Sequence, residues 1–108
     1  MQRAVEITFR DVPHSDALEA EIRDKVSKLE TFYPQLTGCH VVVEMPHKHN
    51  HQGREFLVRV DIKVPGCELV INHEHSSDPH VAVRDAFDAA RRKLQDYARR
   101  QRGEVKRH

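Results

Sequence analysis

Hydrophobic residues recur at helical spacing in two stretches of the chain. In the longer stretch, from Asp78 to Gly103, apolar residues return every three or four positions, at Val83, Ala86, Phe87, Ala90, Leu94 and Tyr97. This spacing places them on one face of an α-helix. Asp78 can cap the start, with Pro79 at the first helical position, and Gly103 predicts the end.

The other helix is predicted between Ser15 and Tyr33. Ser15 can cap its N-terminus, and Asp16 and Glu19 put negative charge in the first turn, where the helix dipole favours it. The apolar stripe that follows has helical spacing: Leu18, Ile22, Val26, Leu29 and Tyr33. Pro34 cannot continue the helix and predicts its end.

Four shorter segments have the pattern of β-strands, with alternating apolar residues or a short valine-rich run. They comprise residues 3–9, 39–45, 54–64 and 68–72. Val64-Pro65-Gly66-Cys67 predicts a type II turn between the last two. The segments 46–53 and 72–78 are predicted loops.

The predicted order is β-α-β-β-β-α, which indicates an α+β fold: a four-stranded mixed sheet with two helices packed on one face. A right-handed crossover should make the first two strands parallel, and hairpins should make the other pairs antiparallel. A chain of 108 residues fits one domain. We assign it to residues 1–102 and expect 103–108 to be a basic, flexible tail.

Charge is distributed unevenly along this chain. Residues 84–108 hold nine Lys or Arg and four Asp or Glu, a net of +5, whereas the whole chain carries +1, which leaves −4 for residues 1–83. Such asymmetry favours nucleic acid or an acidic surface as a partner. A charged helix face that only interacts with solvent is the competing interpretation.

Basic residues of the two helices are the candidate RNA-binding residues. If the helices pack side by side, lysines of the first approach arginines of the second, and together they could follow a phosphate backbone. The candidates are Lys25, Lys28, Arg84, Arg91, Arg92, Lys93, Arg99 and Arg100. Tyr33 and Tyr97 are expected to face the core, so we expect recognition of structured RNA by shape and charge.

Histidines supply the candidate metal ligands. His47, His49 and His51 form an H-x-H-x-H series in one loop, and imidazoles at this spacing can bind Zn, Ni or Cu. A solvated loop is the alternative interpretation, because a specific site needs fixed ligands and a supporting second shell of hydrogen bonds. We therefore expect no cofactor.

Other features bear on the class of protein. No phosphate-binding glycine loop, G-x-S-x-G or H-E-x-x-H motif occurs, which argues against an enzyme. The chain opens directly into a strand pattern and has no long apolar run, so we expect a cytoplasmic protein without a membrane partner. Cys39 and Cys67 are both expected to be buried as reduced thiols.

The ordered set of elements resembles the ribosome hibernation-promoting factor and ribosome-associated inhibitor family of bacteria. The resemblance covers residues 1–102. It rests on the strand Val5–Phe9, SDALEAEIRDKVSKLETFY from Ser15 to Tyr33, the valine strand Val41–Val43, the VPG turn with Glu68–Ile71, and the helix Asp78–Tyr97.

The resemblance implies both a partner and a mechanism. Family members bind the small ribosomal subunit and its rRNA between head and body, in the channel for mRNA and tRNA, and silence translation under stress or in stationary phase. The mechanism is steric, and neither DNA nor catalysis is expected. Lys25, Lys28 and Arg92 fall on basic family positions. The protein is expected to be a monomer away from the ribosome.

This chain departs from the family pattern in several places. His80 stands where the family often has Tyr, Ala89 stands near a family Lys, and the histidine loop is not a family feature. The chain ends soon after the second helix, so whether it also promotes ribosome dimers stays open. A general structured-RNA-binding module and a histidine-loop metal-binding protein are the alternative functions.

Overall fold

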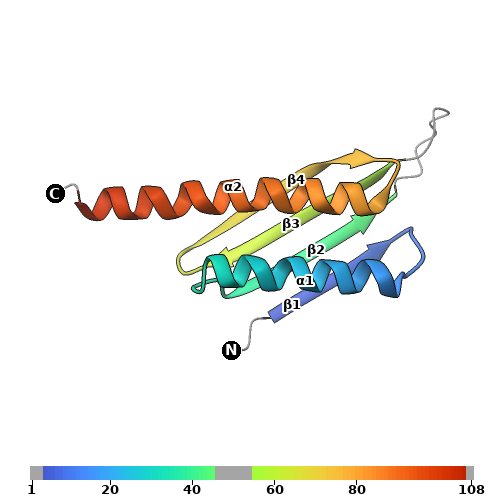
Figure 1. Ribbon diagram of the computed structural model, residues 1–108, viewed down its shortest axis with the longest axis horizontal. Coiled ribbons are helices and arrows are strands. Elements are labelled where there is room, and N and C mark those ends of the chain that lie inside the picture. The colour runs from blue at the N-terminus through green and yellow to red at the C-terminus, as the bar shows by residue number, and fades with distance from the viewer. Residues whose placement is uncertain (1–3, 46–54, 107–108) are drawn as a thin grey trace.

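A computed structural model describes residues 4–45 and 55–106 of the chain. Its six elements follow the predicted order β-α-β-β-β-α (Figure 1). They are β1 (Ala4–Arg10), α1 (Asp16–Phe32), β2 (Gly38–Glu44), β3 (Phe56–Val64), β4 (Cys67–Ser76) and α2 (Pro79–Lys106).

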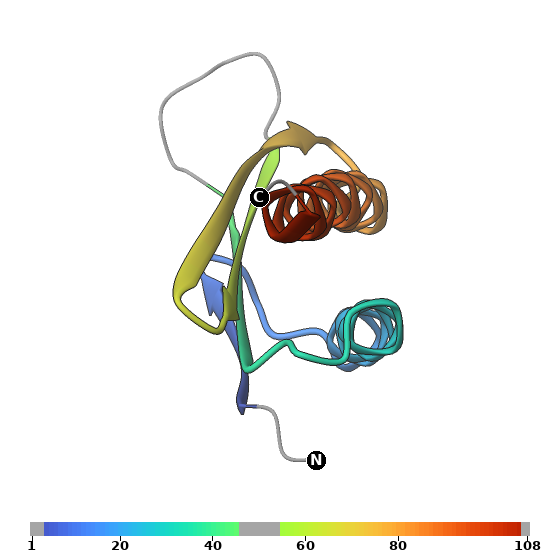
Figure 2. The ribbon, with the colours of Figure 1, turned by 90° about the vertical axis from the view of Figure 1, so that its left-hand side faces the viewer.

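The four strands form one mixed sheet in the order β1-β2-β3-β4. β1 and β2 are parallel, with Ile7 opposite Val41, and the other two pairs are antiparallel. Both helices lie on the same face of this sheet, and the other face, called the uncovered face below, carries no helix in the described part of the chain (Figure 2). The predicted α+β architecture is therefore confirmed.

The core lies between the sheet and the two helices. Each helix contributes the stripe predicted from its spacing, with Ile22 and Leu94 fully buried at 0% exposure. The strands contribute alternate residues: in β3, Val60 and Ile62 are buried while Arg59 points to the uncovered face and is exposed. Most buried apolar residues of the sheet thus need the same cover, which is why both helices pack there, whereas Val42, opposite Arg59, lies on the other face.

Local hydrogen bonds confirm the predicted helix starts. The Ser15 hydroxyl accepts a hydrogen bond from the backbone N–H of Leu18 at 3.1 Å. The Asp78 carboxylate accepts one from the N–H of His80 at 2.9 Å. Each bond satisfies a backbone donor that has no partner within its helix.

The predicted type II turn between β3 and β4 is confirmed by the backbone of Gly66. Its φ is +81°, the left-handed value that the third residue of such a turn needs. A Cβ at this position would meet no atom within 4 Å, so the requirement for glycine is conformational rather than steric.

The predicted stop of the second helix at Gly103 is wrong, because α2 continues to Lys106. A terminating glycine normally adopts a left-handed backbone, and among the described glycines Gly66 is the one with positive φ. Flanking residues with good helix propensity carry the helix through Gly103. No helix in the described ranges combines the length and the apolar character needed to cross a bilayer.

β4 is also longer than predicted, since residues 73–76 continue the strand instead of forming a loop. The pairing with β3 shifts between Phe56 and Val58: Val58 lies opposite His73, and Phe56 lies opposite Ser76. A bulge of this kind absorbs an extra residue, so alternation in the sequence does not reveal it.

The two cysteines differ in environment. Cys39 on β2 is buried as expected, but the expectation for Cys67 is wrong, because it is exposed beside the tight turn. Burial, with the neighbouring charge of Asp61, raises the pKa of the Cys39 thiol to about 12. Both thiols are free.

The buried end of the α2 stripe can be tested with Leu94→Ala. We expect the free energy of unfolding to fall by about 2–5 kcal/mol, because the fully buried side chain leaves a cavity. The measurement is chemical denaturation followed by circular dichroism. Val70→Ala, at a side chain that is 37% exposed, is the control and should cost about 1 kcal/mol or less. Equal losses in both variants would contradict the packing described here.

Thiol alkylation at pH 8 tests the contrast between the cysteines. The pKa of Cys39 is raised to about 12, so its reactive thiolate forms only at much higher pH. Iodoacetamide should therefore modify Cys67 in the folded protein, and Cys39 only after urea is added. Mass spectrometry of the two peptides reads the result, with Cys67→Ser as control. Rapid labelling of Cys39 in the native protein would contradict its burial.

Candidate nucleic-acid interface

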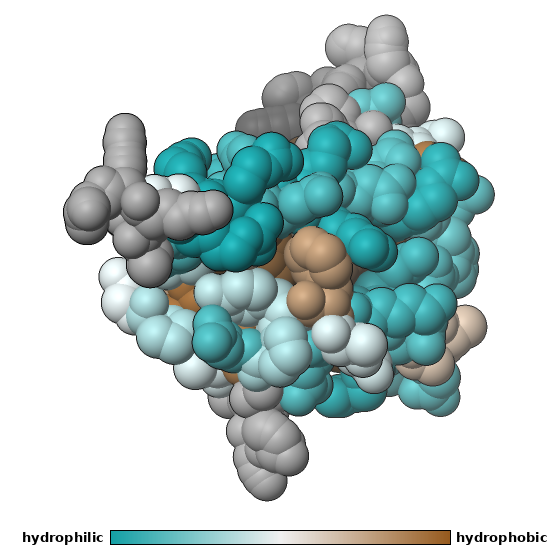
Figure 3. Space-filling model, turned by 60° about the vertical axis from the view of Figure 1, so that its left-hand side comes forward, coloured by the Kyte–Doolittle hydropathy of each residue, from teal (hydrophilic) through white to brown (hydrophobic). Residues whose placement is uncertain are grey.

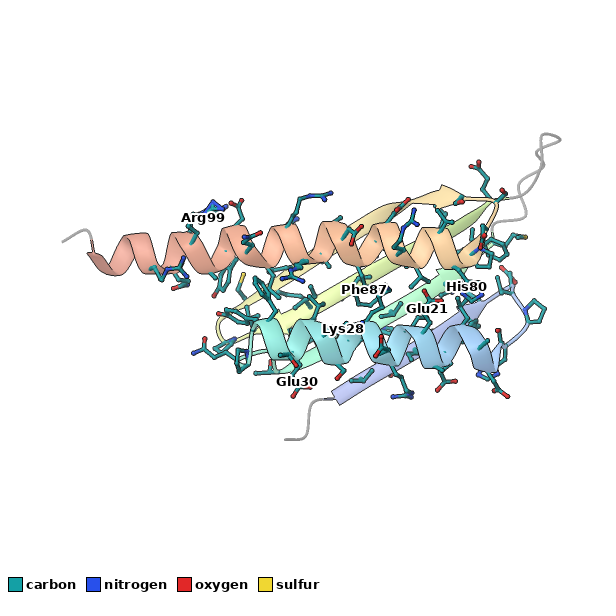
Figure 4. The ribbon with its side chains drawn as sticks, viewed as in Figure 1. Glu21, Lys28, Glu30, His80, Phe87 and Arg99 are labelled. Carbon is teal, nitrogen blue, oxygen red and sulfur yellow. The ribbon has the colours of Figure 1, made fainter. Side chains whose placement is uncertain are left out.

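One flank of α1 faces α2. Glu21, Lys25, Lys28 and Phe32 recur at helical spacing and so share this flank. Two contacts show that it faces α2: Glu21 pairs with His80, and the Phe32 ring lies under Arg91. Lys28 lies between these contacts along α1, beside α2 (Figure 4). Lys25 and Lys28 thus share the flank that these two contacts place beside α2.

The predicted basic residues of α2 follow three lines, each made of residues seven positions apart. Arg84 and Arg91 form the line beside α1. Arg92 and Arg99 form the next, and the Arg99 side chain points away from α1 (Figure 4). Lys93 and Arg100 form the third line, towards β4. The predicted basic residues are thus spread around the helix.

Contacts with the rest of the protein differ among these basic residues. Lys93 donates a hydrogen bond from its ammonium to the Val70 carbonyl on β4 at 3.2 Å. Three others pair with carboxylates on their own helix: Lys28 with Asp24 at 3.3 Å, Arg84 with Asp85 at 3.4 Å, and Arg100 with Asp96 at 3.9 Å. Such exposed pairs are weak and are readily exchanged for phosphate.

Four of the eight candidates have no such carboxylate partner. Within the described part of the chain, no Asp or Glu lies within ion-pair distance of Lys25, Arg91, Arg92 and Arg99. Their positive charges are therefore the ones most available to an external anion. Phosphate oxygens suit them, because a guanidinium can donate two parallel hydrogen bonds to one phosphate.

Glu21 and His80 connect the two helices at the N-terminal end of α2. The Glu21 carboxylate and the imidazole of His80 point toward one another between the two helices (Figure 4) and form a hydrogen-bonded pair. This contact places a carboxylate on the flank that carries the lysines. The positive character between the helices therefore rises away from this end, towards Lys28 and Arg91.

Aromatic side chains cluster towards the C-terminal end of α1. The guanidinium carbon of Arg91 lies 4.6 Å from the centroid of the Phe32 ring, which is a cation–π contact. Tyr33 and Tyr97 meet edge to face with 6.3 Å between centroids. Both tyrosines are half-buried and pack against the core, as predicted. Seen from this end, a small hydrophobic area interrupts a mostly hydrophilic surface (Figure 3).

Phe32 is a residue that the sequence interpretation missed. It falls outside the apolar stripe of α1, yet it lies one turn after Lys28 on the flank that faces α2. This spacing was the available signal, because an aromatic residue beside a basic stripe is a candidate for contact with nucleic acid.

A pocket of about 320 Å³ lies at the opposite end of the molecule, where both helices begin. Its lining is mainly apolar and includes Leu18, Met45 and Phe56. On its rim, hydrogen bonds from His14 and then Arg23 hold the pKa of the Glu19 carboxyl below its usual range. These polar groups form an ion-paired surface at the start of α1.

The candidate metal ligands His47, His49 and His51 lie outside the described residues. Within residues 4–45 and 55–106, no three His, Cys, Asp or Glu side chains come together as metal ligands would. His80, the histidine on the helical face, is engaged with Glu21.

Comparisons with known proteins find a matching family model, a curated relative and solved structures of the same fold. The family model described as "Sigma 54 modulation protein / S30EA ribosomal protein" matches residues 5–102. A curated protein of Deinococcus radiodurans, named ribosome hibernation promotion factor, is 25% identical over 95 residues. The match covers 88% of this chain and 49% of that protein, so the chain spans about half the length of this relative.

Two solved structures share the fold. One is a ribosomal subunit interface protein from Coxiella burnetii, with a TM-score of 0.74, 18% identity, and coverage of 88% of this chain and 97% of that one. The other is the N-terminal domain of Protein Y from Thermus thermophilus, with a TM-score of 0.72, 16% identity, and coverage of 89% and 99%.

The contact between Arg91 and Phe32 predicts a difference between adjacent arginines. Arg91→Ala should lower the free energy of unfolding by about 0.5–1 kcal/mol, because it removes a cation–π contact and the packing of the side-chain stem. Arg92→Ala, with no ring beneath it among the described residues, should change stability by under about 0.5 kcal/mol. Urea denaturation measures both, and equal effects would argue against the contact.

Proposed function

Because this chain belongs to the Sigma 54 modulation protein / S30EA ribosomal protein family, we propose that it is a ribosome-binding translation inhibitor, a hibernation factor. The names of its relatives support this proposal: one is called a ribosome hibernation promotion factor, and another a ribosomal subunit interface protein. The partner is the small ribosomal subunit with its rRNA, and the site of action is the cytoplasm. The protein occupies the channel for mRNA and tRNA and silences translation under stress or in stationary phase.

The observation that carries the proposal is the paired-helix face with its eight basic residues, four of which have no carboxylate partner among the described residues. Lys25 and Lys28 lie on the flank of α1 that faces α2, Arg84 and Arg91 form the line of α2 beside α1, and Arg92 and Arg99 extend the positive surface along α2. Lys93 and Arg100 border this surface on the side of β4. These residues bind phosphates of structured RNA, which holds the protein in place by charge and shape.

The inhibition is steric in this proposal. The described body is elongated, with extents of 55 × 27 × 19 Å, and its helical face is rigidly supported by the sheet. A folded body held in the channel by rRNA phosphates excludes mRNA and tRNA without any chemical step. The function therefore needs neither a catalytic residue nor a cofactor.

The two alternative functions are a general structured-RNA-binding module and a histidine-loop metal-binding protein. The comparisons do not favour either of them. They differ from the proposed function in what would displace the protein: free duplex RNA in the first case and a chelator in the second.

Co-sedimentation with ribosomes in a sucrose gradient tests the proposed function directly. The protein should migrate with the small subunit or the whole ribosome at low salt, resist an excess of duplex RNA and of chelator, and dissociate at high salt. A peak of ribosome dimers would show whether the chain also promotes dimers. Protein that stays at the top of the gradient at low salt would contradict the proposal.

The contribution of the helical face is tested with the double variant Lys28→Glu and Arg92→Glu. If both side chains contact phosphates, ribosome affinity falls, and the slope of log affinity against log salt becomes shallower by about 2. Filter binding at several salt concentrations measures both quantities.

The matched control is the double variant Arg59→Glu and Lys63→Glu, which makes the same charge change on the uncovered face of the sheet. It should leave the salt slope unchanged, and circular dichroism should show that both double variants fold. An unchanged affinity in the folded helical variant would exclude this face as the binding surface.

A further inference from the structure

We propose that Arg91 and Phe32 form a stacking site for an unpaired RNA base at the C-terminal end of α1, where it faces α2. This inference rests on the proposed function and deepens it, because it adds a contact with a nucleobase to the contacts with phosphates. Its ligand class is a single-stranded nucleotide, such as a base in an RNA loop or bulge.

The first support is the order in which the two side chains are layered. The guanidinium of Arg91 lies over the Phe32 ring, with 4.6 Å between the guanidinium carbon and the ring centroid. The ring is half-buried against the core, whereas Arg91 is exposed. A planar guanidinium supported by a ring on one side leaves its other side open to solvent, and bases stack on such surfaces in RNA-binding proteins.

The second support is that Arg91 has no competing charge partner. In the described part of the chain no carboxylate pairs with it, unlike Arg84, which pairs with Asp85, and Arg100, which pairs with Asp96. Among the described residues, the Phe32 ring is the contact partner of the Arg91 guanidinium. Its N–H donors remain available to the phosphate or sugar of the nucleotide whose base it stacks.

The third support is the arrangement of other cations around the stack. Lys28 lies one turn before Phe32 on the same flank of α1, and its side chain is 71% exposed. Arg84 lies two turns before Arg91 on α2. Both are placed to bind phosphates of the same strand beside the stacked base, so that one nucleotide segment would contact all of them.

The neighbouring tyrosines are less suited to this role. Tyr97 donates a hydrogen bond from its hydroxyl to the Pro65 carbonyl at 3.4 Å and accepts one from the Gln101 amide at 3.1 Å. Tyr33 meets the Tyr97 ring edge to face. Both rings are therefore held as part of the body, and Arg91 with Phe32 is the layered surface that faces outwards.

The test compares two octamers of equal charge by fluorescence anisotropy: oligouridylate and a phosphodiester oligomer with abasic sugars. The wild-type protein should bind the oligouridylate about fivefold more tightly, at the low end of what one stacked base contributes. If the contact between Arg91 and Phe32 only stabilised the fold, the protein would bind the two octamers with equal affinity. Equal affinities in the wild-type protein would therefore overturn the stacking site.

Two variants separate stacking from folding and from charge. Phe32→Leu removes the aromatic ring but keeps an apolar side chain. Arg91→Lys keeps the positive charge but removes the planar guanidinium group. Each should abolish the preference for the oligomer with bases. Phe32→Leu should also leave affinity for the abasic oligomer within about twofold, because it changes none of the phosphate-binding residues. A preference that persists in Phe32→Leu would overturn the proposal.

Arg59→Lys is the matched control, since it makes the same chemical change on the uncovered sheet face. This variant should keep the full preference for the octamer with bases. If it lost that preference, the preference could not be attributed to the stack of Arg91 on Phe32. The oligonucleotide measurement needs no ribosome. Failure of the wild-type protein to co-sediment would thus reject the proposed function, whereas loss of the base preference alone would reject only the stacking site.

Discussion

The structure depends on one constraint: a single apolar face of the sheet has to be covered by both helices. β2 and β3 bury most of their valines and isoleucines on that side, and the stripes of α1 and α2 are the apolar surfaces that can cover them. The helices must therefore lie side by side. Once they do, the flank of α1 that carries Lys25, Lys28 and Phe32 faces α2, and this arrangement follows from the packing of the core.

The same constraint decides which basic residues act together. The rotation of α2 is set by Phe87, Ala90 and Leu94, which pack into the core, so Arg91 is directed towards α1 and Lys93 towards β4. A charge count along α2 treats these residues as equivalent. Packing divides them into a residue stacked on a ring, residues paired with carboxylates, and residues free to meet a partner.

Much of the fold could be predicted from the sequence, because its signals are local. Period-two patterns, a valine-rich run and helical spacing located all six elements, and Ser15 and Pro34 marked the ends of α1. The errors lie where a local pattern is ambiguous. Gly103 resembles a helix stop but keeps a helical backbone, the extension of β4 depends on a bulge, and the exposure of Cys67 depends on the neighbouring turn.

The candidate site was less predictable, because its key contacts join residues far apart in the chain. Glu21 with His80, and Phe32 with Arg91, depend on the relative rotation and offset of two helices. Periodicity gives the face of each helix but not how the two faces meet. The set of basic residues could be named from the sequence, whereas their division into paired and available charges required the packed structure.

The charge pattern of the two faces indicates how the protein meets a polyanion. On the uncovered sheet face, side chains of opposite charge form ion pairs, such as Arg10 with Glu44 and Arg59 with Asp61 at 3.0 Å. A net charge of +1 gives little long-range attraction for the molecule as a whole. Local charge therefore orients the approach of the protein to a polyanion. The helical face carries cations that no described carboxylate neutralises, so a phosphate backbone has its lowest electrostatic free energy against this face.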